Sequence, residues 1–117
     1  NHVKCGIEID ISSYEKPMRF RLVRPGSNWY TAGRTVECIL EDMRSITFKI
    51  ITPENKYYDE VVDISEIPFR EVKTTRVSVS VSFTDSDRCN ITIKDLGFGE
   101  FVKSSGKVIS KELVLRS

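Results

Sequence analysis

The stretch Arg76-Val-Ser-Val-Ser-Val-Ser-Phe83 alternates apolar and polar residues without interruption. Because successive side chains of a β-strand point to opposite faces, the apolar residues of this stretch share one face: Val77, Val79, Val81 and Phe83. A polar turn, Thr84-Asp-Ser-Asp-Arg88, leads into a second alternating run, Asn90-Ile-Thr-Ile93. The pattern predicts a β-hairpin with one buried face.

The same alternation continues on both sides of this hairpin. It predicts further strands over residues 3–11, 18–23, 34–40, 46–51, 57–64 and 108–115. We expect 34–40 and 46–51 to form a second hairpin, and the more polar 57–64 strand to lie at a sheet edge. No window shows helical spacing with caps. Of the sandwich and the barrel that such a pattern allows, we predict an all-β, single antiparallel β-sandwich of about eight short strands.

The composition fits one globular domain over residues 1–117. Apolar residues make up 39% of the chain and 18 basic residues balance 17 acidic ones, so neither disorder nor a polyelectrolyte partner is favoured. No apolar run approaches the ~20 residues of a membrane-spanning helix and no secretory leader precedes the first strand, which predicts a cytoplasmic protein without membrane contacts. Because Asn1 leads almost directly into a strand, we expect a C-terminal part of a longer protein.

Three cysteines, Cys5, Cys38 and Cys89, lie far apart in apolar or alternating segments. An odd number of scattered cysteines is poorly suited to a disulfide framework, whereas a free cysteine behaves as a small buried apolar residue. We expect three reduced thiols in the interior of a cytoplasmic protein.

The residue types that catalysis and metal binding need are sparse. The only histidine is His2, and three scattered cysteines do not complete a zinc site with it. Asp85 and Asp87 lack the glycine and distal glutamate of a calcium loop and are predicted to belong to the hairpin turn. The segment Ser104-Ser-Gly-Lys107 lacks the glycine-rich stretch and helix of a phosphate loop. We therefore expect no enzymatic activity and no cofactor.

One basic cluster suggests a second kind of ligand. Four arginines lie near Trp29 and Tyr30 in the sequence: Arg19, Arg21, Arg24 and Arg34. Phosphate contacts combined with base stacking on a β surface are typical of barrels that bind single-stranded nucleic acid. The competing interpretation is a solvated strand face whose acidic neighbours neutralise the arginines. On that balance we expect nucleic acid not to be the ligand.

Several short segments follow one another along nearly the whole chain: Gly6-Ile-Glu8, Leu22-Val-Arg-Pro-Gly-Ser-Asn-Trp-Tyr-Thr31 leading into Val36, Glu41-Asp42, Ile46-Thr-Phe-Lys-Ile50, Ile64-Ser-Glu-Ile-Pro68, Lys94-Asp95 and Ser105-Gly-Lys107. In their order and spacing, the chain resembles the substrate-binding β-sandwich of DnaK-type chaperones, the seventy-kilodalton heat-shock family. The resemblance implies a divergent member of that family.

The resemblance implies an extended apolar peptide as the ligand, held in a channel with one deep pocket for an aliphatic side chain. The positions that would line this channel are Ile7, Ile9, Leu40, Ile46, Phe48 and Ile67. For each of them the alternative is an ordinary place in the core. The resemblance also implies an ATPase domain upstream in the same chain, as the nucleotide-binding partner of this domain.

Two residues depart from the family's pattern. Asp10 stands where the family places a larger apolar residue over the peptide, and Glu37 stands at a position that is usually apolar or aromatic. An unpaired carboxylate in an apolar channel costs several kcal/mol. We expect a non-enzymatic module that binds peptides or a partner protein. The alternatives are an oligonucleotide-binding barrel that uses the arginine face and a purely structural docking domain.

Overall fold

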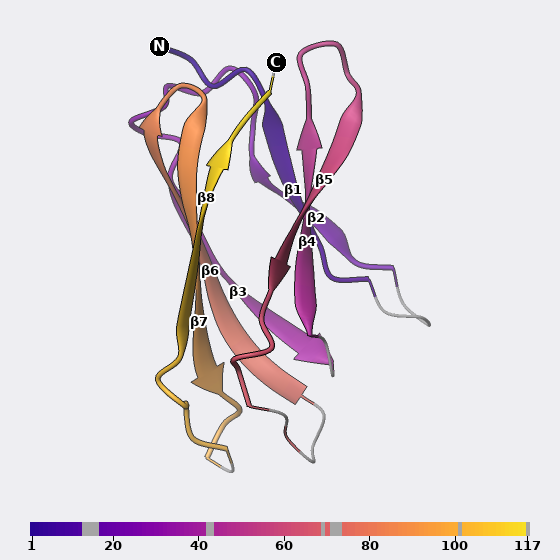
Figure 1. The fold of residues 1–117 in the computed structure, drawn as a ribbon, viewed down its shortest axis with the longest axis vertical. Coiled ribbons are helices and arrows are strands. Elements are labelled where there is room, and N and C mark those ends of the chain that lie inside the picture. The colour runs from indigo at the N-terminus through magenta and orange to yellow at the C-terminus, as the bar shows by residue number, and fades with distance from the viewer. Residues whose placement is uncertain (13–16, 42–43, 69, 71–73, 101, 117) are drawn as a thin grey trace.

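Two antiparallel four-stranded sheets pack face to face (Figure 1). A computed structural model describes residues 1–12, 17–41, 44–68, 70, 74–100 and 102–116. The first sheet has the order β2-β1-β4-β5 and consists of β1 (Gly6–Asp10), β2 (Arg19–Val23), β4 (Ser45–Ile51) and β5 (Tyr57–Asp63). The second has the order β3-β6-β7-β8 and consists of β3 (Arg34–Glu41), β6 (Thr74–Asp85), β7 (Arg88–Gly97) and β8 (Val108–Val114). The predicted all-β antiparallel sandwich of eight strands is confirmed.

The β6–β7 hairpin forms the centre of the second sheet. Its strands are 12 and 10 residues long, longer than the alternating runs alone, and Val79 lies opposite Ile93 in their register. The turn is closed locally, because the Asp87 N–H donates to Asp85 Oδ1 at 3.0 Å. Both the hairpin and the assignment of these two aspartates to its turn are confirmed.

The predicted second hairpin, between 34–40 and 46–51, is wrong. β3 pairs with β6, with Cys38 opposite Val77, whereas β4 lies between β1 and β5 in the other sheet. The chain therefore crosses from one sheet to the other between β3 and β4, over a connection whose residues 42–43 lie outside the described part. Alternation records which face of a strand is buried, and two strands that face each other across a core show the same alternation as two that pair.

The apolar faces of both sheets meet in one core. Its members are buried side chains from every strand, among them Ile7, Ile9, Leu22, Cys38, Leu40, Ile46, Phe48, Ile50, Val62, Val77, Val79, Val81, Ile91, Ile93 and Leu113. All three cysteines are free and buried, as predicted. Burial raises the pKa of the Cys38 thiol to about 11. Burial, with a smaller contribution from Glu112, raises the pKa of the Cys89 thiol to about 12.

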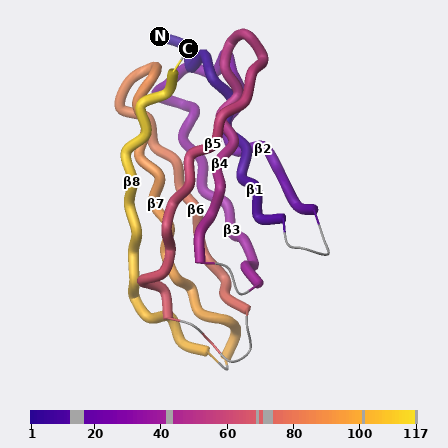
Figure 2. The backbone as a smooth tube through the Cα atoms, turned by 45° about the vertical axis from the view of Figure 1, so that its right-hand side comes forward, coloured from indigo at the N-terminus to yellow at the C-terminus, as the bar shows by residue number. Residues whose placement is uncertain are grey.

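The outermost strands are β2 and β5 in the first sheet and β3 and β8 in the second (Figure 2). The position of β5 confirms the edge strand predicted over 57–64. Both chain ends lie at the same end of the sandwich (Figure 1). Among the described residues, no helix is long and apolar enough to cross a membrane.

Phe48 is fully buried in the middle of the first sheet and supplies the test of this core. We predict that Phe48→Ala lowers the free energy of unfolding by about 3–5 kcal/mol, because it removes apolar contacts and leaves a cavity. Urea denaturation of both proteins measures the change. Ser82→Ala, on the exposed outer face of β6, is the control and should change it by less than about 0.5 kcal/mol. Equal effects of the two substitutions would contradict the assignment of Phe48 to the core.

Candidate functional site

The six residues predicted to line a peptide channel all lie in the hydrophobic core. Each is at most 3% exposed: Ile7, Ile9, Leu40, Ile46, Phe48 and Ile67. Ile9 and Phe48 are cross-strand neighbours on β1 and β4, the two central strands of the first sheet. In this arrangement a peptide could contact the five strand residues only if the two sheets separated, and Ile67 only if the connection after β5 moved. Binding at these positions therefore stays a prediction, and the described structure offers no exposed channel lined by them.

The two carboxylates that depart from the chaperone pattern lie on the outer faces of the sandwich. Asp10 is half-buried at the end of β1, where its Oδ1 accepts a hydrogen bond from the Ser12 N–H at 3.0 Å. Hydrogen bonding to Ser12 lowers the pKa of Asp10. Glu37 is exposed on β3, opposite Ser78. Neither carboxylate is buried in an apolar surrounding, so neither carries the desolvation cost that an apolar channel would impose.

The predicted arginine patch is divided and partly neutralised. Arg19 Nε lies 3.0 Å from Glu8 Oε1, and Arg21 Nη2 lies 3.9 Å from Glu8 Oε2, on the outer face of the first sheet. The next strands continue this row with the ion pair between Lys49 and Asp59, whose Nζ and Oδ1 are 2.8 Å apart. The charges thus alternate across all four strands, which is the solvated face that the sequence offered as the competing interpretation.

The other members of that patch lie in and after the connection from β2 to β3. Trp29 packs partly against the core and Tyr30 is 66% exposed, with the two rings edge to face at 5.7 Å. Of these two aromatic side chains, only that of Tyr30 is therefore largely exposed to solvent. The fold is also a two-sheet sandwich and not the barrel that the oligonucleotide hypothesis assumed.

A buried ion pair between Arg70 and Asp95 anchors the end opposite the termini. The two side chains form a bidentate contact, with Nη1 to Oδ1 at 3.1 Å and Nη2 to Oδ2 at 2.6 Å. The Asp95 side chain is inaccessible to solvent and that of Arg70 is 8% exposed. Burial alone would raise the pKa of Asp95, but hydrogen bonds from Arg70, Ser105 and Gly97 outweigh burial and hold this pKa well below its usual range.

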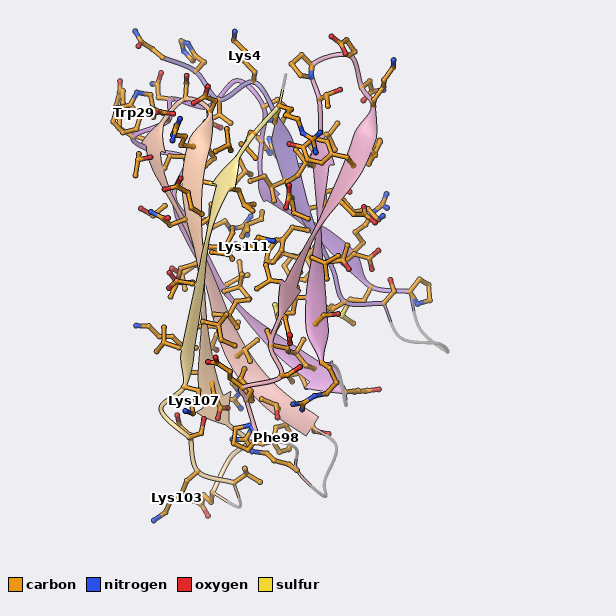
Figure 3. The ribbon with its side chains drawn as sticks, viewed as in Figure 1. Lys4, Trp29, Phe98, Lys103, Lys107 and Lys111 are labelled. Carbon is orange, nitrogen blue, oxygen red and sulfur yellow. The ribbon has the colours of Figure 1, made fainter. Side chains whose placement is uncertain are left out.

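The Asp95 carboxylate also accepts a hydrogen bond from the segment 104–107, which superficially resembles a phosphate loop. The Ser105 N–H donates to Asp95 Oδ2 at 2.9 Å, and the next two N–H groups donate to serine hydroxyls within the segment. Lys103 and Lys107 lie around this loop (Figure 3). Because its N–H groups already have internal acceptors, the segment is built to hold Asp95 in place.

Small-molecule and metal sites find little support in the described part of the chain. No group of three or more histidine, cysteine, aspartate or glutamate residues there is placed to hold a metal ion. A cavity of about 60 Å³ near the termini is lined by Lys4, Cys5, Ser86, Asp87 and Leu115. It is well below the ~300–1,000 Å³ typical of ligand pockets.

Two cationic side chains each bind one main-chain carbonyl at an edge of the first sheet. Arg34, on β3, donates from Nη1 to the Arg21 carbonyl oxygen of β2 at 3.1 Å. Lys111, on β8, donates from Nζ to the Val61 carbonyl oxygen of β5 at 3.1 Å. Unpaired main-chain groups at a sheet edge are templates for a further strand, and covering them removes that possibility. One outward main-chain carbonyl on each outer strand of the first sheet is therefore occupied by a side chain that comes from the second sheet.

The edges of the second sheet are different. The main-chain groups of successive residues in an antiparallel strand point alternately to its two sides. Odd-numbered residues of β7 and β8 bond to each other, so the even-numbered residues of β7 bond to those of β6. The odd-numbered residues of β6 are then left to bond to the even-numbered residues of β3. The odd-numbered residues then point to the open side: Thr35, Glu37, Ile39 and Glu41. Within the described residues, no main-chain group of these four has a hydrogen-bonding partner on that side.

The side chains of these four residues lie on the outer face and are all exposed. Ile39 is 54% exposed between two glutamates, Glu37 and Glu41, neither of which forms an ion pair with any described residue. Unpaired main-chain groups, two free carboxylates and an exposed isoleucine thus occur together. We call these four residues the β3 edge, and they are the candidate binding site.

A comparison with protein families matches residues 2–115 to the family described as a domain of unknown function, DUF8552. The chain belongs to the DUF8552 family. No curated protein and no solved structure matches the chain significantly. The match covers both sheets and the β3 edge of this DUF8552 domain.

The sequence contained one signal for the β3 edge. Ile39 is an apolar residue at an outward position of the strand predicted over 34–40, between Cys38 and Leu40, which face the core. An isoleucine that breaks the alternation on an edge strand indicates exposed apolar surface. The signal could be read only once β3 was known to be an edge, and the expected pairing with 46–51 concealed that.

The Arg70–Asp95 pair gives a pH-dependent prediction. A carboxylate whose pKa is depressed on folding stabilises the protein above its unfolded pKa, about 3.9, and loses this effect as the pH falls through the folded pKa. Asp95→Asn leaves the Arg70 guanidinium buried without a carboxylate. We predict a loss of roughly 3–5 kcal/mol in the free energy of unfolding at neutral pH. The difference from wild type should shrink as the pH falls below about 4.

Denaturant titrations at several pH values measure this difference. Asp59→Asn is the matched control, because its ion pair with Lys49 is partly exposed, with 49% of the Asp59 side chain and 23% of the Lys49 side chain accessible to solvent. It should change the stability by no more than about 1 kcal/mol. A loss in Asp95→Asn that is as small as in the control, or that does not depend on pH, would contradict the role assigned to the buried pair.

Proposed function

We propose that this domain is a non-enzymatic protein-interaction module that binds an extended polypeptide segment along the β3 edge. The observation that carries the proposal is the row of main-chain N–H and C=O groups of the odd-numbered β3 residues, which have no partner within the described chain. Addition of a strand to an exposed edge satisfies such groups and is a recurrent mode of peptide recognition. β3 is eight residues long, which gives a segment several pairing positions.

The exposed side chains define the segment that would fit. Residues directly opposite each other on antiparallel strands lie side by side on the same face. A lysine or arginine opposite Glu37 and another opposite Glu41 would each meet a free carboxylate, and an apolar residue between them would cover Ile39. The partner is therefore an extended segment in which two basic residues flank an apolar one at alternate positions.

The size of these contributions predicts a weak complex. A main-chain hydrogen bond contributes roughly 0.5–1.5 kcal/mol net, and an exposed charge pair roughly 0.2–1 kcal/mol. Association and the ordering of a flexible segment cost several kcal/mol in return. We expect a dissociation constant of about 10 μM or weaker, since 1 μM already requires about 8 kcal/mol.

The resemblance to DnaK-type chaperones supports the same class of ligand, an extended polypeptide, and the proposal differs only in where it binds. It places the ligand on an exposed edge because the six residues of the expected channel are buried. An upstream nucleotide-binding domain remains part of the proposal that the resemblance supports. A substitution such as Ile46→Asp cannot test the channel cleanly, because a charge at a fully buried position destabilises the fold itself.

The peptide Thr-Lys-Thr-Ile-Thr-Lys-Thr, labelled with a fluorophore, tests the proposal by fluorescence polarisation. We predict that the wild-type domain binds it in preference to the same peptide with glutamate in place of lysine. The double substitution Glu37→Lys and Glu41→Lys should weaken binding of the basic peptide about tenfold and favour the acidic peptide. Binding of the basic peptide should also weaken as the salt concentration rises.

Two further variants complete the experiment. Glu54→Lys changes the same charge in the exposed 52–56 connection, away from β3, and should leave peptide binding as in wild type. Glu37→Pro removes an N–H from the open side of β3 without removing a bond to β6, and should abolish binding while the domain stays folded. Unchanged affinity in both the charge-reversed and the proline variant would rule out the β3 edge as the site.

A further inference from the structure

The outer strand at the opposite side of the second sheet, β8, is also open. Its odd-numbered residues face β7, because the Leu115 N–H donates to the Asp87 carbonyl and the Asp95 N–H donates to the Lys107 carbonyl, with a regular register between these points. By alternation, the main-chain groups of the even-numbered residues point away from β7: Val108, Ser110, Glu112 and Val114. Within the described chain these groups have no main-chain partner.

The sequence of β8, Val-Ile-Ser-Lys-Glu-Leu-Val, is symmetric in chemical character about Lys111. Read from the two ends inward, valine matches valine, isoleucine matches leucine, and serine matches glutamate. We propose that two copies of this chain pair through β8 in antiparallel orientation about a two-fold axis at Lys111. Their second sheets would then form one continuous sheet across the dimer.

This register pairs the open main-chain groups and the outward side chains of the two copies, and it sets Lys111 opposite Lys111 of the second copy. It places the open groups of Val108 against those of Val114 of the second copy, and those of Ser110 against those of Glu112 of the second copy. It also keeps outward side chains beside outward ones, which a shift by one residue would reverse. Val108 and Val114 are each 51% exposed in the single chain, and the pairing would cover them with each other.

Lys111 is the residue that would ordinarily oppose such pairing. An inward-facing charge on an edge strand discourages strand addition, because a continued sheet would bury the charge. Here the ammonium reaches across to the first sheet, where it lies 3.1 Å from the Val61 carbonyl oxygen and 3.6 Å from Glu60 Oε2 (Figure 3). Its charge is therefore directed away from the open edge and already has a counter-ion.

The other edges are less suited to a second copy. The carbonyl groups of Val61 on β5 and Arg21 on β2 are capped by side chains from the second sheet. β3 presents Glu37 and Glu41, and like charges brought together across a two-fold axis repel. The β8 pairing and peptide binding at the β3 edge use opposite sides of the second sheet, so neither proposal depends on the other.

Sedimentation equilibrium at chain concentrations up to about 1 mM tests the proposal. At that concentration an association free energy of only ~4 kcal/mol is enough to detect dimers. Wild type should show a reversible monomer–dimer equilibrium. Val108→Lys combined with Val114→Lys places lysine against lysine in both outer pairs, and should raise the dissociation constant at least tenfold. Val108→Lys combined with Val114→Glu places lysine against glutamate in the same pairs, and should restore dimers.

Proline substitutions separate pairing from folding. Ser110→Pro removes an N–H only from the open side of β8, and should give a folded monomer by circular dichroism and sedimentation. Glu37→Pro, the equivalent change on β3, should leave the dimer intact. A wild-type chain that stays monomeric at about 1 mM, dimers that survive the double-lysine substitution, or a lysine–glutamate variant that dimerises no better than the double-lysine variant would overturn the proposal.

Discussion

Two cationic side chains make the edges of the first sheet less available to other strands than those of the second. Arg34 and Lys111 start on the outer strands of the second sheet, and each donates to a main-chain carbonyl at an edge of the first. They join the two layers along both sides and each occupies one carbonyl at an edge of the first sheet. Because an unpaired strand edge is the natural site for another strand, these contacts favour strand pairing at the second sheet over the first.

The two open edges of the second sheet present different chemistry on the same outer face. The β3 edge combines Ile39 with two free carboxylates, whereas β8 is nearly uncharged on that face except for Glu112. If two copies join through β8, their β3 edges lie at the far ends of one continuous sheet. Two weak sites carried by one rigid assembly gain apparent affinity for a ligand that contains two suitable segments.

The buried pair of Arg70 and Asp95 serves a different purpose. It connects the segment after β5 and the loop after β7 to the end of the second sheet, through contacts to the Lys103 carbonyl and the Ser105 N–H. Several donors surround one carboxylate, so the buried charge is compensated and holds Arg70, Lys103 and Ser105 together. The apparent likeness of 104–107 to a phosphate loop is explained by the same contacts, because the anion that the segment holds is Asp95 itself.

Much of the fold could be predicted from residue order. Alternation located all eight strands and identified the inward faces of β4 and β6, because apolar burial imposes a period of two on any strand with one buried face. The more polar composition of 57–64 indicated that this strand lies at an edge. Alternation also led to the wrong hairpin between β3 and β4. Strands that face each other across a core and strands that pair within a sheet satisfy it equally well.

The candidate site was the part that residue order left undetermined. Five of the six predicted channel residues obey the same alternation as the core, and Ile67 lies in the connection after β5. Only the tertiary packing shows that all six are buried. The β3 edge depends on which neighbour β3 has, on which side its N–H groups point, and on which carbonyl Arg34 reaches. By itself the sequence determined which side chains turn inward. The tertiary structure alone decided which strand edges stay open, because every residue type except proline offers the same main-chain hydrogen-bonding groups.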